Sequence, residues 1–222
     1  MNIAERLYRV KKDLPTSVEL VAVSKFHSSA VIKEAYDAGQ RLFGESRVQE
    51  LTIKYDELPK DIKWHFIGHL QLNKIKYIAH FIDTIQSVDS IKLMEEINKY
   101  AEKYNRIIHV LIQIHIAKEN HKYGFSFEEA EKLFSNSQHK YFPHLHIQGL
   151  MGMSTFTEQT EQIQKEFSDL ASYYKRIKKE YFAEDTEFNV LSMGMSDDYP
   201  IAIKEGSSMI RVGSKIFGER QY

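Results

Sequence analysis

The sequence alternates from end to end between short apolar runs and longer amphipathic stretches, and this alternation is its most constraining feature. Eight runs have the length and composition of β-strands: residues 19–24, 41–45, 63–68, 83–88, 107–115, 146–153, 188–195 and 208–214. Parallel strands that are covered on both faces form continuous apolar runs. The alternation therefore predicts an α/β fold with parallel strands.

The stretches between these runs have helical periodicity, over residues 2–13, 28–39, 47–57, 70–80, 90–104, 126–137, 157–180 and 197–206. Ser90, Ser126 with Glu129, and Asp197 are start signals, and Gly39 is a stop signal. Eight strand–helix units in 222 residues predict a single (β/α)8 barrel of the TIM type with an additional N-terminal helix. An open doubly wound sheet is the alternative.

Nothing in the composition divides the chain, which has no Gly/Ser linker and no low-complexity tract. We therefore predict a single domain over residues 1–222. Lys and Arg total 30 and Asp and Glu total 31, for a formal net charge of −1, so binding to nucleic acid is not expected.

The sequence also indicates a cellular location. The opening segment MNIAERLYRVKKDL lacks the apolar core of a signal peptide, and no apolar run approaches the roughly 18 residues needed to span a bilayer. The absence of Cys excludes disulfides, thiolate nucleophiles and Cys-ligated zinc. We expect a cytoplasmic protein with no membrane partner.

In barrels of this kind the active face is the carboxyl end of the strands, so residues at strand ends are the candidates for chemistry. Lys25 follows the apolar run LVAV. A lysine at the mouth of a packed barrel loses hydration that stabilises its charged form, which makes its amine available as a nucleophile toward an aldehyde or ketone. A solvated lysine at a strand end is the alternative.

The segments 192–196 and 213–214 follow the last two predicted strands and combine small residues with hydroxyls, as in Ser192, Gly213 and Ser214. Barrels of this architecture usually hold a phosphate in these two loops, where glycine lets the backbone approach and exposed N–H groups receive the anion. Each loop, taken alone, is equally consistent with an ordinary turn.

Arg211 alternates with Ile210 and Val212, so we expect its side chain to point into the barrel. A buried guanidinium needs a polar partner, which could be a structural carboxylate or the ring nitrogen of a bound heterocycle.

The chain has 10 histidines, but their spacing matches no metal-binding pattern, and we predict no metal site. His65 is the histidine of interest, because the segment WHFIGH places it within a barrel strand.

Several segments resemble the YggS/PROSC family of pyridoxal-phosphate-binding proteins, in the same order and over nearly the whole chain. They are VAVSK, AYDAGQRLFGESRVQEL, WHFIGHLQLNK, GLMGM and LSMGMSDDYPIAIKEGSSMIRVGSKIFGER. The resemblance implies the barrel of the alanine racemase amino-terminal domain.

The resemblance also implies roles for residues. Lys25 would hold pyridoxal 5′-phosphate (PLP) as a covalent aldimine, and Arg211 would face the pyridine nitrogen. Ser192, Met193, Gly213 and Ser214 would contribute to the phosphate cradle, and Ser46 and His65 complete the candidate cofactor-binding residues. Ser46 stands where the family usually has Asn, which puts any hydrogen bond from that position to the ring in doubt.

Three functions are open. The first is a non-catalytic carrier or buffer in intracellular PLP homeostasis, whose partners are PLP-dependent apoenzymes or free amino acids and which works as a monomer. The second is a PLP-dependent amino-acid racemase, which would need a second base; in alanine racemases a tyrosine from another domain supplies it, and this chain ends at Tyr222. The third, a phosphate-metabolite enzyme using Glu45, leaves Lys25 and Arg211 unexplained. We expect the carrier, with no catalytic residues.

Overall fold

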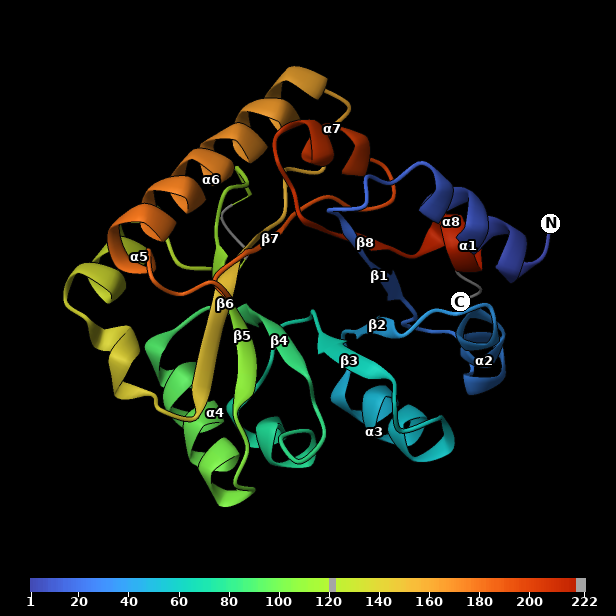
Figure 1. Cartoon of the computed structure of the whole chain (residues 1–222), viewed down its shortest axis with the longest axis horizontal. Coiled ribbons are helices and arrows are strands. Elements are labelled where there is room, and N and C mark those ends of the chain that lie inside the picture. Colours follow the sequence, from blue (N-terminus) through green and yellow to red (C-terminus); the bar gives the residue numbers. More distant parts are fainter. Residues whose placement is uncertain (120–122, 219–222) are drawn as a thin grey trace.

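The computed structural model describes residues 1–119 and 123–218 of the chain. Its strands are β1 (Glu19–Val23), β2 (Leu42–Glu45), β3 (Lys63–Phe66), β4 (Thr84–Val88), β5 (Ile108–Ile114), β6 (Leu145–Gly152), β7 (Val190–Ser192) and β8 (Met209–Val212). Neighbours in sequence pair in parallel, and β1 also pairs with β8, so the sheet closes into a barrel. Figure 1 shows this ring with the helices outside it. The predicted eight-stranded barrel is confirmed, and the open sheet is excluded.

The described helices are α1 (Ile3–Lys12), α2 (Ser29–Asp37), α3 (Val48–Glu57), α4 (Ile91–Lys103), α5 (Phe127–Ser135), α6 (Thr160–Tyr181), α7 (Tyr199–Lys204) and α8 (Ser214–Phe217), with the 3-10 helices η1 (Leu72–Tyr77) and η2 (Gln138–Tyr141). The helix α1 confirms the predicted N-terminal helix. The helical segment predicted over 70–80 is the 3-10 helix η1. The N–H of Lys74 bonds the carbonyl of Gln71, three residues back, and no side chain caps the helix start.

Two of the predicted strands are shortened the most in the structure, and a glycine lies just beyond the end of each. The run 188–195 keeps only the three residues of β7, since Gly194 adopts a φ of +94° and turns the chain. The run 208–214 ends at Val212, because Gly213 caps the short helix α8. Loops rather than strands therefore form the barrel mouth at these two positions.

The predicted start residues of α4 and α5, Ser90 and Ser126, are confirmed. The Ser90 hydroxyl accepts the N–H of Leu93, and Ser126 forms a capping box with the residue three positions on. Asp197 was the wrong start residue for α7, which Asp198 precedes. The carboxylate of Asp198 turns back to accept the N–H of Met195 at 2.6 Å, and so organises the loop after β7.

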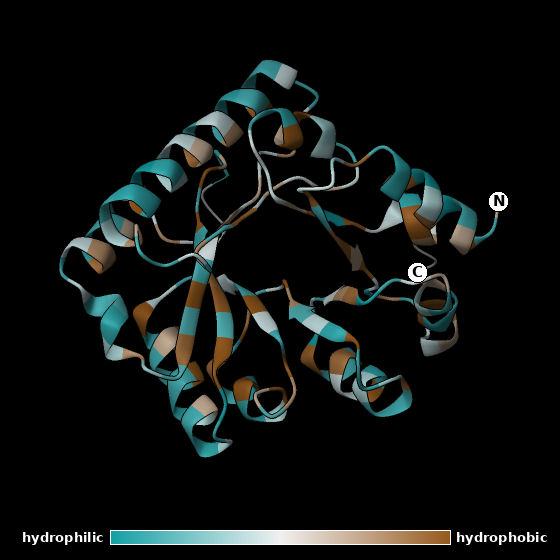
Figure 2. Ribbon diagram, viewed as in Figure 1, coloured by the Kyte–Doolittle hydropathy of each residue, from teal (hydrophilic) through white to brown (hydrophobic). Residues whose placement is uncertain are grey.

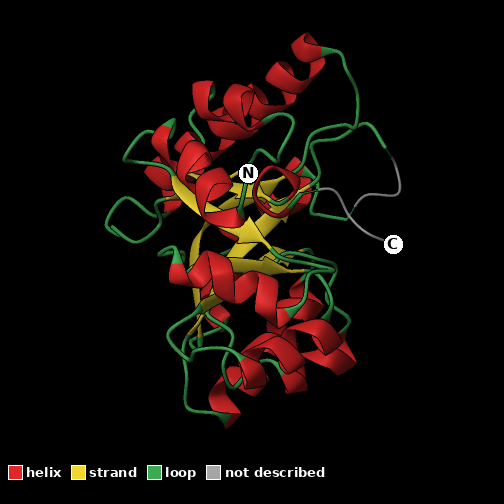
Figure 3. Cartoon of the chain, turned by 90° about the vertical axis from the view of Figure 1, so that its right-hand side faces the viewer, coloured by secondary structure: helices red, strands yellow, loops and turns green. Residues whose placement is uncertain are grey.

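Apolar side chains pack on both sides of the sheet. The larger cluster lies between strands and helices and includes Phe43, Trp64 and Phe66; in Figure 2 the helices turn their hydrophobic faces toward the ring. Figure 3 shows the strands enclosed between helices in side view. The smaller cluster fills the barrel interior with Val21, Leu111, Met151, Val190 and Met209. Because all strands are parallel, their carboxyl ends meet at one mouth.

Candidate functional site

A cavity of about 320 Å³ opens at this mouth. It is lined by Val23, Lys25, His27, Ile67, Met153, Phe156, Met195, Ser196, Asp197, Arg211, Gly213, Ser214 and Gly218. The lining thus joins the ends of the first and last strands with the loops after β3, β6 and β7. Of the predicted site residues, the structure brings Lys25, Arg211, Gly213 and Ser214 together around this cavity.

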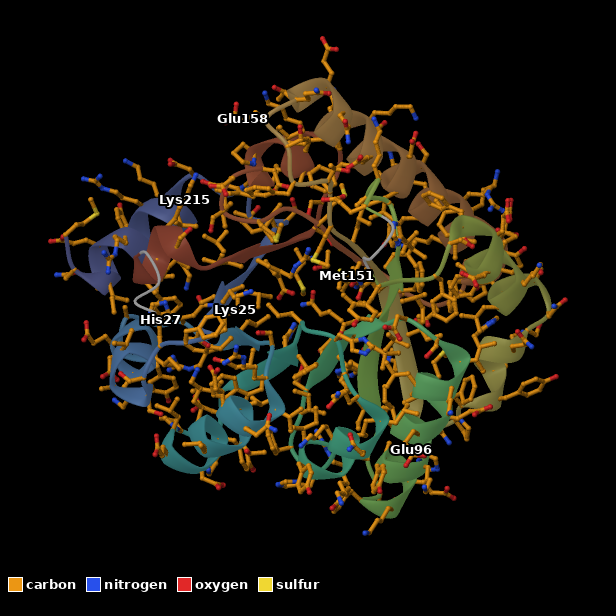
Figure 4. The ribbon with its side chains drawn as sticks, turned by 180° about the vertical axis from the view of Figure 1, so that it is seen from behind. Lys25, His27, Glu96, Met151, Glu158 and Lys215 are labelled. Atoms are coloured by element: carbon orange, nitrogen blue, oxygen red, sulfur yellow. The ribbon has the colours of Figure 1, made fainter. Side chains whose placement is uncertain are left out.

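Lys25 lies in a β-turn immediately after β1. The N–H of His27 bonds the carbonyl of Ser24 at 3.1 Å and closes the turn across Lys25 and Phe26. Ser24 is fully buried, whereas Lys25 is partly exposed. Figure 4 places Lys25 at the ring of strands, beside β1, whereas Glu96 lies farther out, in the layer of helices. The turn therefore directs the lysine toward the barrel mouth, where it lines the cavity.

The backbone at the start of α8 can receive an anion. Within the described part of the chain, the N–H groups of Ser214 and Lys215 have no hydrogen-bond partner, and the Gly213 N–H donates only a long bond of 3.3 Å to the Ser196 hydroxyl. A Cβ at Gly213 would stand 3.0 Å from the carbonyl oxygen of Val23, so glycine permits β8 and β1 to approach here. Unpaired N–H groups beside glycine are suited to a phosphate.

Arg211 points into the barrel, as its alternation with apolar neighbours predicts. One terminal nitrogen, Nη1, donates to the Ser192 hydroxyl at 2.6 Å, and Nη2 donates to the Gly152 carbonyl at 2.9 Å. Both partners are neutral, and no carboxylate forms an ion pair with Arg211 among the residues described. Burial lowers the pKa of Arg211 to about 10, although the charge of Asp198 opposes this effect. The guanidinium is therefore still charged at neutral pH, and its remaining N–H groups can meet a ligand.

The Ser192 bond continues as a chain of hydrogen bonds through the barrel. The Ser192 hydroxyl donates to Gln86 Oε1 at 2.7 Å, and Gln86 Nε2 donates to His65 Nδ1 at 2.8 Å. His65 Nε2 then lies 3.6 Å from Asp83. Because the Gln86 amide nitrogen can only donate, His65 Nδ1 accepts and the His65 proton sits on Nε2. Burial lowers the His65 pKa to about 4, so this imidazole is neutral at pH 7.

Four predicted cofactor-binding residues do not line the cavity. Ser192 and Met193 are fully buried, because the last residue of β7 turns its side chain into the hydrogen-bonded interior, and the Met193 N–H is used by the Met209 carbonyl. His65 lies deeper in the barrel. Ser46 faces a neighbouring hollow, where its backbone stands against Gly68. As the structure stands, none of these side chains contacts the cavity directly.

Glu45 does not provide an accessible acid or base. It is completely buried, and its Oε1 accepts bonds from Ser24 Oγ at 2.6 Å and Lys54 Nζ at 2.7 Å. Burial raises the Glu45 pKa, against the opposing charge of Lys54. Because Glu45 does not line the cavity, the phosphate-metabolite enzyme loses its proposed catalytic carboxylate.

Several lining residues were not predicted individually from the sequence. Ile67 and Met153 are apolar and look like core in a sequence, although each directly follows the end of a strand. Met195 and Ser196 lay within the predicted segment 192–196 but were not singled out, and the Ser196 hydroxyl accepts the Gly213 N–H. Inspecting the first residue after every strand end, polar or not, finds Ile67 and Met153.

A larger hollow of about 770 Å³ lies at the start of α6 and is lined mainly by charged and polar side chains, including Lys118, Glu161 and Asp169. It contains neither Lys25 nor Arg211, so we place the site in the smaller cavity. Over residues 1–119 and 123–218, no three His, Cys, Asp or Glu side chains are grouped to hold a metal. No helix in the same ranges is long and apolar enough to cross a membrane.

Comparisons with known proteins agree with this geometry. The family described as alanine racemase, N-terminal domain, matches residues 1–221. The alanine racemase of Clostridium difficile 630 has the same fold, with a TM-score of 0.78 at 15% identity, and the match covers all of this chain and 57% of the racemase. The protein is therefore an alanine-racemase-type barrel.

More similar relatives define the family. The pyridoxal phosphate homeostasis protein of Aquifex aeolicus is 36% identical, with 100% of both chains covered, and that of Escherichia coli K12 is 37% identical over 94% of this chain and 88% of its own. PipY of Synechococcus elongatus PCC7942, solved with PLP bound, has a TM-score of 0.88 at 36% identity and covers 98% of this chain and 100% of PipY. The chain belongs to the pyridoxal phosphate homeostasis protein family.

Proposed function

We propose that this protein binds PLP in the cavity at the barrel mouth and serves intracellular PLP homeostasis as a carrier or buffer, without significant amino-acid turnover. The observation that carries the proposal is the convergence of Lys25, Arg211 and the unpaired N–H groups of α8 on one cavity of about 320 Å³. An amine, a cation and an anion-binding backbone match the aldehyde, ring nitrogen and phosphate of PLP. PipY, with PLP bound, supports this assignment.

Lys25 is the residue that we propose holds the cofactor covalently. Its amine nitrogen adds to the aldehyde carbon, a C=N bond forms, and the aldehyde oxygen leaves as water. Addition of water reverses the step, as a carrier requires. Lys25 is suited to this role because it is the lysine that lines the cavity among the described residues.

Arg211 is the proposed partner of the pyridine nitrogen. A guanidinium has only donors, so a ring nitrogen that faces it must accept a hydrogen bond and stays unprotonated. An unprotonated ring withdraws electrons weakly and gives little stabilisation to a carbanion. This property supports a carrier over an enzyme that removes an α-proton.

The phosphate would lie against the N–H groups of Gly213, Ser214 and Lys215, with the Ser196 hydroxyl beside them. Ser192 and Met193 would support this phosphate-binding surface without contacting the phosphate. The Ser192 hydroxyl would orient Arg211. For Ser46 and His65 we propose no direct bond to the cofactor.

A PLP-dependent racemase is the alternative, and the alanine-racemase-type barrel is the observation that favours it. A racemase needs an acid or base on each face of the bound amino acid. No tyrosine belongs to the described lining of the cavity, and His27 is its one imidazole. This lining supports the carrier.

We further propose that residues 1–222 form one domain that works as a monomer in the cytoplasm. Its partners would be free amino acids, which displace Lys25 from the aldehyde, and PLP-dependent apoenzymes, which receive the cofactor. The single closed barrel supports the domain assignment.

The test is covalent trapping. Purified protein is loaded with PLP, reduced with borohydride and analysed by mass spectrometry of its peptides. We expect one adduct at Lys25, absent from Lys25→Ala and unchanged in Lys33→Ala, whose lysine lies on α2 outside the cavity. An adduct that survives on another lysine in Lys25→Ala contradicts the assignment.

A further inference from the structure

We propose that Glu50 and Lys54 of α3 are positioning residues for Lys25: they hold the two peptide groups that flank it, and thereby keep its amine aimed into the cavity. This inference rests on the proposed function of Lys25. It concerns residues that lie outside the cavity and have no contact with it.

The turn that presents Lys25 contains a strained residue. Phe26, the third residue of the Ser24–His27 turn, has a φ of +69°. Turns with positive φ at this position favour Gly or Asn, because a Cβ crowds the backbone there. For a bulky residue such a conformation is strained and persists only when the surroundings impose it. Something outside the turn must therefore stabilise it.

The first turn of α3 supplies two such contacts to Phe26. Glu50 Oε2 accepts the Phe26 N–H at 2.9 Å, and the guanidinium carbon of Arg47 lies 4.6 Å from the centre of the Phe26 ring. Burial alone would raise the Glu50 pKa, but the Phe26 N–H bond and the charges of Lys54 and Arg47 together lower it. The carboxylate is therefore charged at neutral pH, and a charged acceptor binds an N–H more strongly than a neutral one.

Lys54 holds the other side of the turn. Its Nζ donates to the Ser24 carbonyl at 3.0 Å and to Glu45 Oε1 at 2.7 Å, and it lies 3.4 Å from Glu50 Oε2. The side chain of Lys54 is 6% exposed, so these bonds compete little with water. Ser24 Oγ also donates to Glu45 Oε1. The carbonyl before Lys25 and the N–H after it are thus both fixed from α3.

Fixing these two groups determines the direction of Lys25. Along β1, Leu20 and Ala22 face the outer core and Val21 faces the interior, and Val23 continues the inward positions by lining the cavity. Ser24 then faces α3, and Lys25 returns to the inside. If the turn relaxed at Phe26, the lysine amine would lose this direction, and a misplacement of about 1 Å can slow a reaction by up to about 100-fold.

The test compares the rate of Lys25 modification with binding that needs no amine. Formation of the borohydride-trapped Lys25 adduct is followed after mixing with PLP. Affinity for pyridoxine 5′-phosphate, which has a phosphate and a ring but no aldehyde, is measured separately. For Glu50→Ala we expect adduct formation to slow about tenfold or more, with affinity for pyridoxine 5′-phosphate unchanged. Glu50→Gln retains an acceptor for the Phe26 N–H and should recover most of the rate.

Two comparisons separate positioning from a general structural effect. Glu96→Ala removes a carboxylate of similar exposure, 28% against 24% for Glu50, from the distant helix α4 and should leave the rate unchanged. In a Phe26→Asn background, which tolerates positive φ, Glu50→Ala should slow the reaction less than it does with Phe26 present.

Equal adduct rates in wild type, Glu50→Ala and Glu50→Gln would overturn the positioning role, as would a parallel loss of affinity for pyridoxine 5′-phosphate in Glu50→Ala. Failure of the proposed function gives a different result, because the wild type itself would then form no adduct at Lys25.

Discussion

Arg211 is the residue whose surroundings constrain the chemistry of the cavity most. Its two observed partners, the Ser192 hydroxyl and the Gly152 carbonyl, fix the plane of the guanidinium without neutralising it. A carboxylate partner would have made Arg211 part of a closed ion pair. The neutral partners instead leave a charged donor that faces the cavity.

Ser192 should stabilise this arrangement measurably. Ser192→Ala leaves both Arg211 Nη1 and Gln86 Oε1 buried without their present partner, and we expect the free energy of unfolding to fall by about 2 kcal/mol. Denaturant unfolding checks the value. Ser28→Ala is the matched control, since its hydroxyl caps nothing at the start of α2 and its loss should change stability by less than about 0.5 kcal/mol. Equal effects of the two substitutions on the free energy of unfolding would show that the hydrogen bonds of Ser192 do not contribute to stability.

His65 should make stability dependent on pH. Its pKa is lowered from 6.5 to about 4 in the folded protein, so the unfolded chain binds more protons between these values. Stability is therefore complete above pH 6.5 and falls as the pH drops toward 4, by up to about 3 kcal/mol. The measurement is unfolding free energy against pH, in wild type and in His65→Gln. The slope between pH 6.5 and 4 should be smaller in the variant, and identical slopes would refute the assignment to His65.

At the scale of elements, α8 and the loop after β7 line the side of the cavity where we propose that the phosphate binds. Gly213→Ala puts a Cβ 3.0 Å from the Val23 carbonyl oxygen and should push α8 away from β1. We expect wild type to bind PLP much more tightly than pyridoxal, which lacks the phosphate, and the substitution to reduce that preference about tenfold. Titration of both ligands into both proteins checks this. Equal affinity of the wild type for PLP and pyridoxal would show that the phosphate does not contribute to binding.

The sequence predicted the elements better than the details of the site. Strand period and barrel geometry were enough to place Lys25 at a strand end and Arg211 inside the barrel. The partners of the Ser192 hydroxyl could not be predicted, because only the three-dimensional order of β4, β7 and β8 brings Gln86 and Arg211 to it. The bond from Glu50 to the Phe26 N–H was equally hidden, since it joins residues 24 positions apart.

At the scale of the whole molecule, one barrel presents two different environments. Apolar packing between strands and helices supports the fold, while a polar chain from Asp83 to Arg211 crosses the interior and ends at the cavity. Figure 4 shows Lys25 and Met151 toward the middle of the same ring. The scaffold resembles that of alanine racemases, so the fold by itself is compatible with both the proposed carrier and an enzyme.

If the barrel mouth holds PLP without turning over amino acids, a bound amino acid should keep its α-proton, and exchange of that proton with solvent is the property to measure. PLP-loaded protein is incubated with several L-amino acids in deuterated water and followed by NMR, with the same concentration of free PLP as the control. We expect exchange no faster than with free PLP, because a ring nitrogen facing Arg211 would be unprotonated and no tyrosine belongs to the described lining of the cavity. Rapid exchange over many turnovers, abolished by Lys25→Ala, would contradict it.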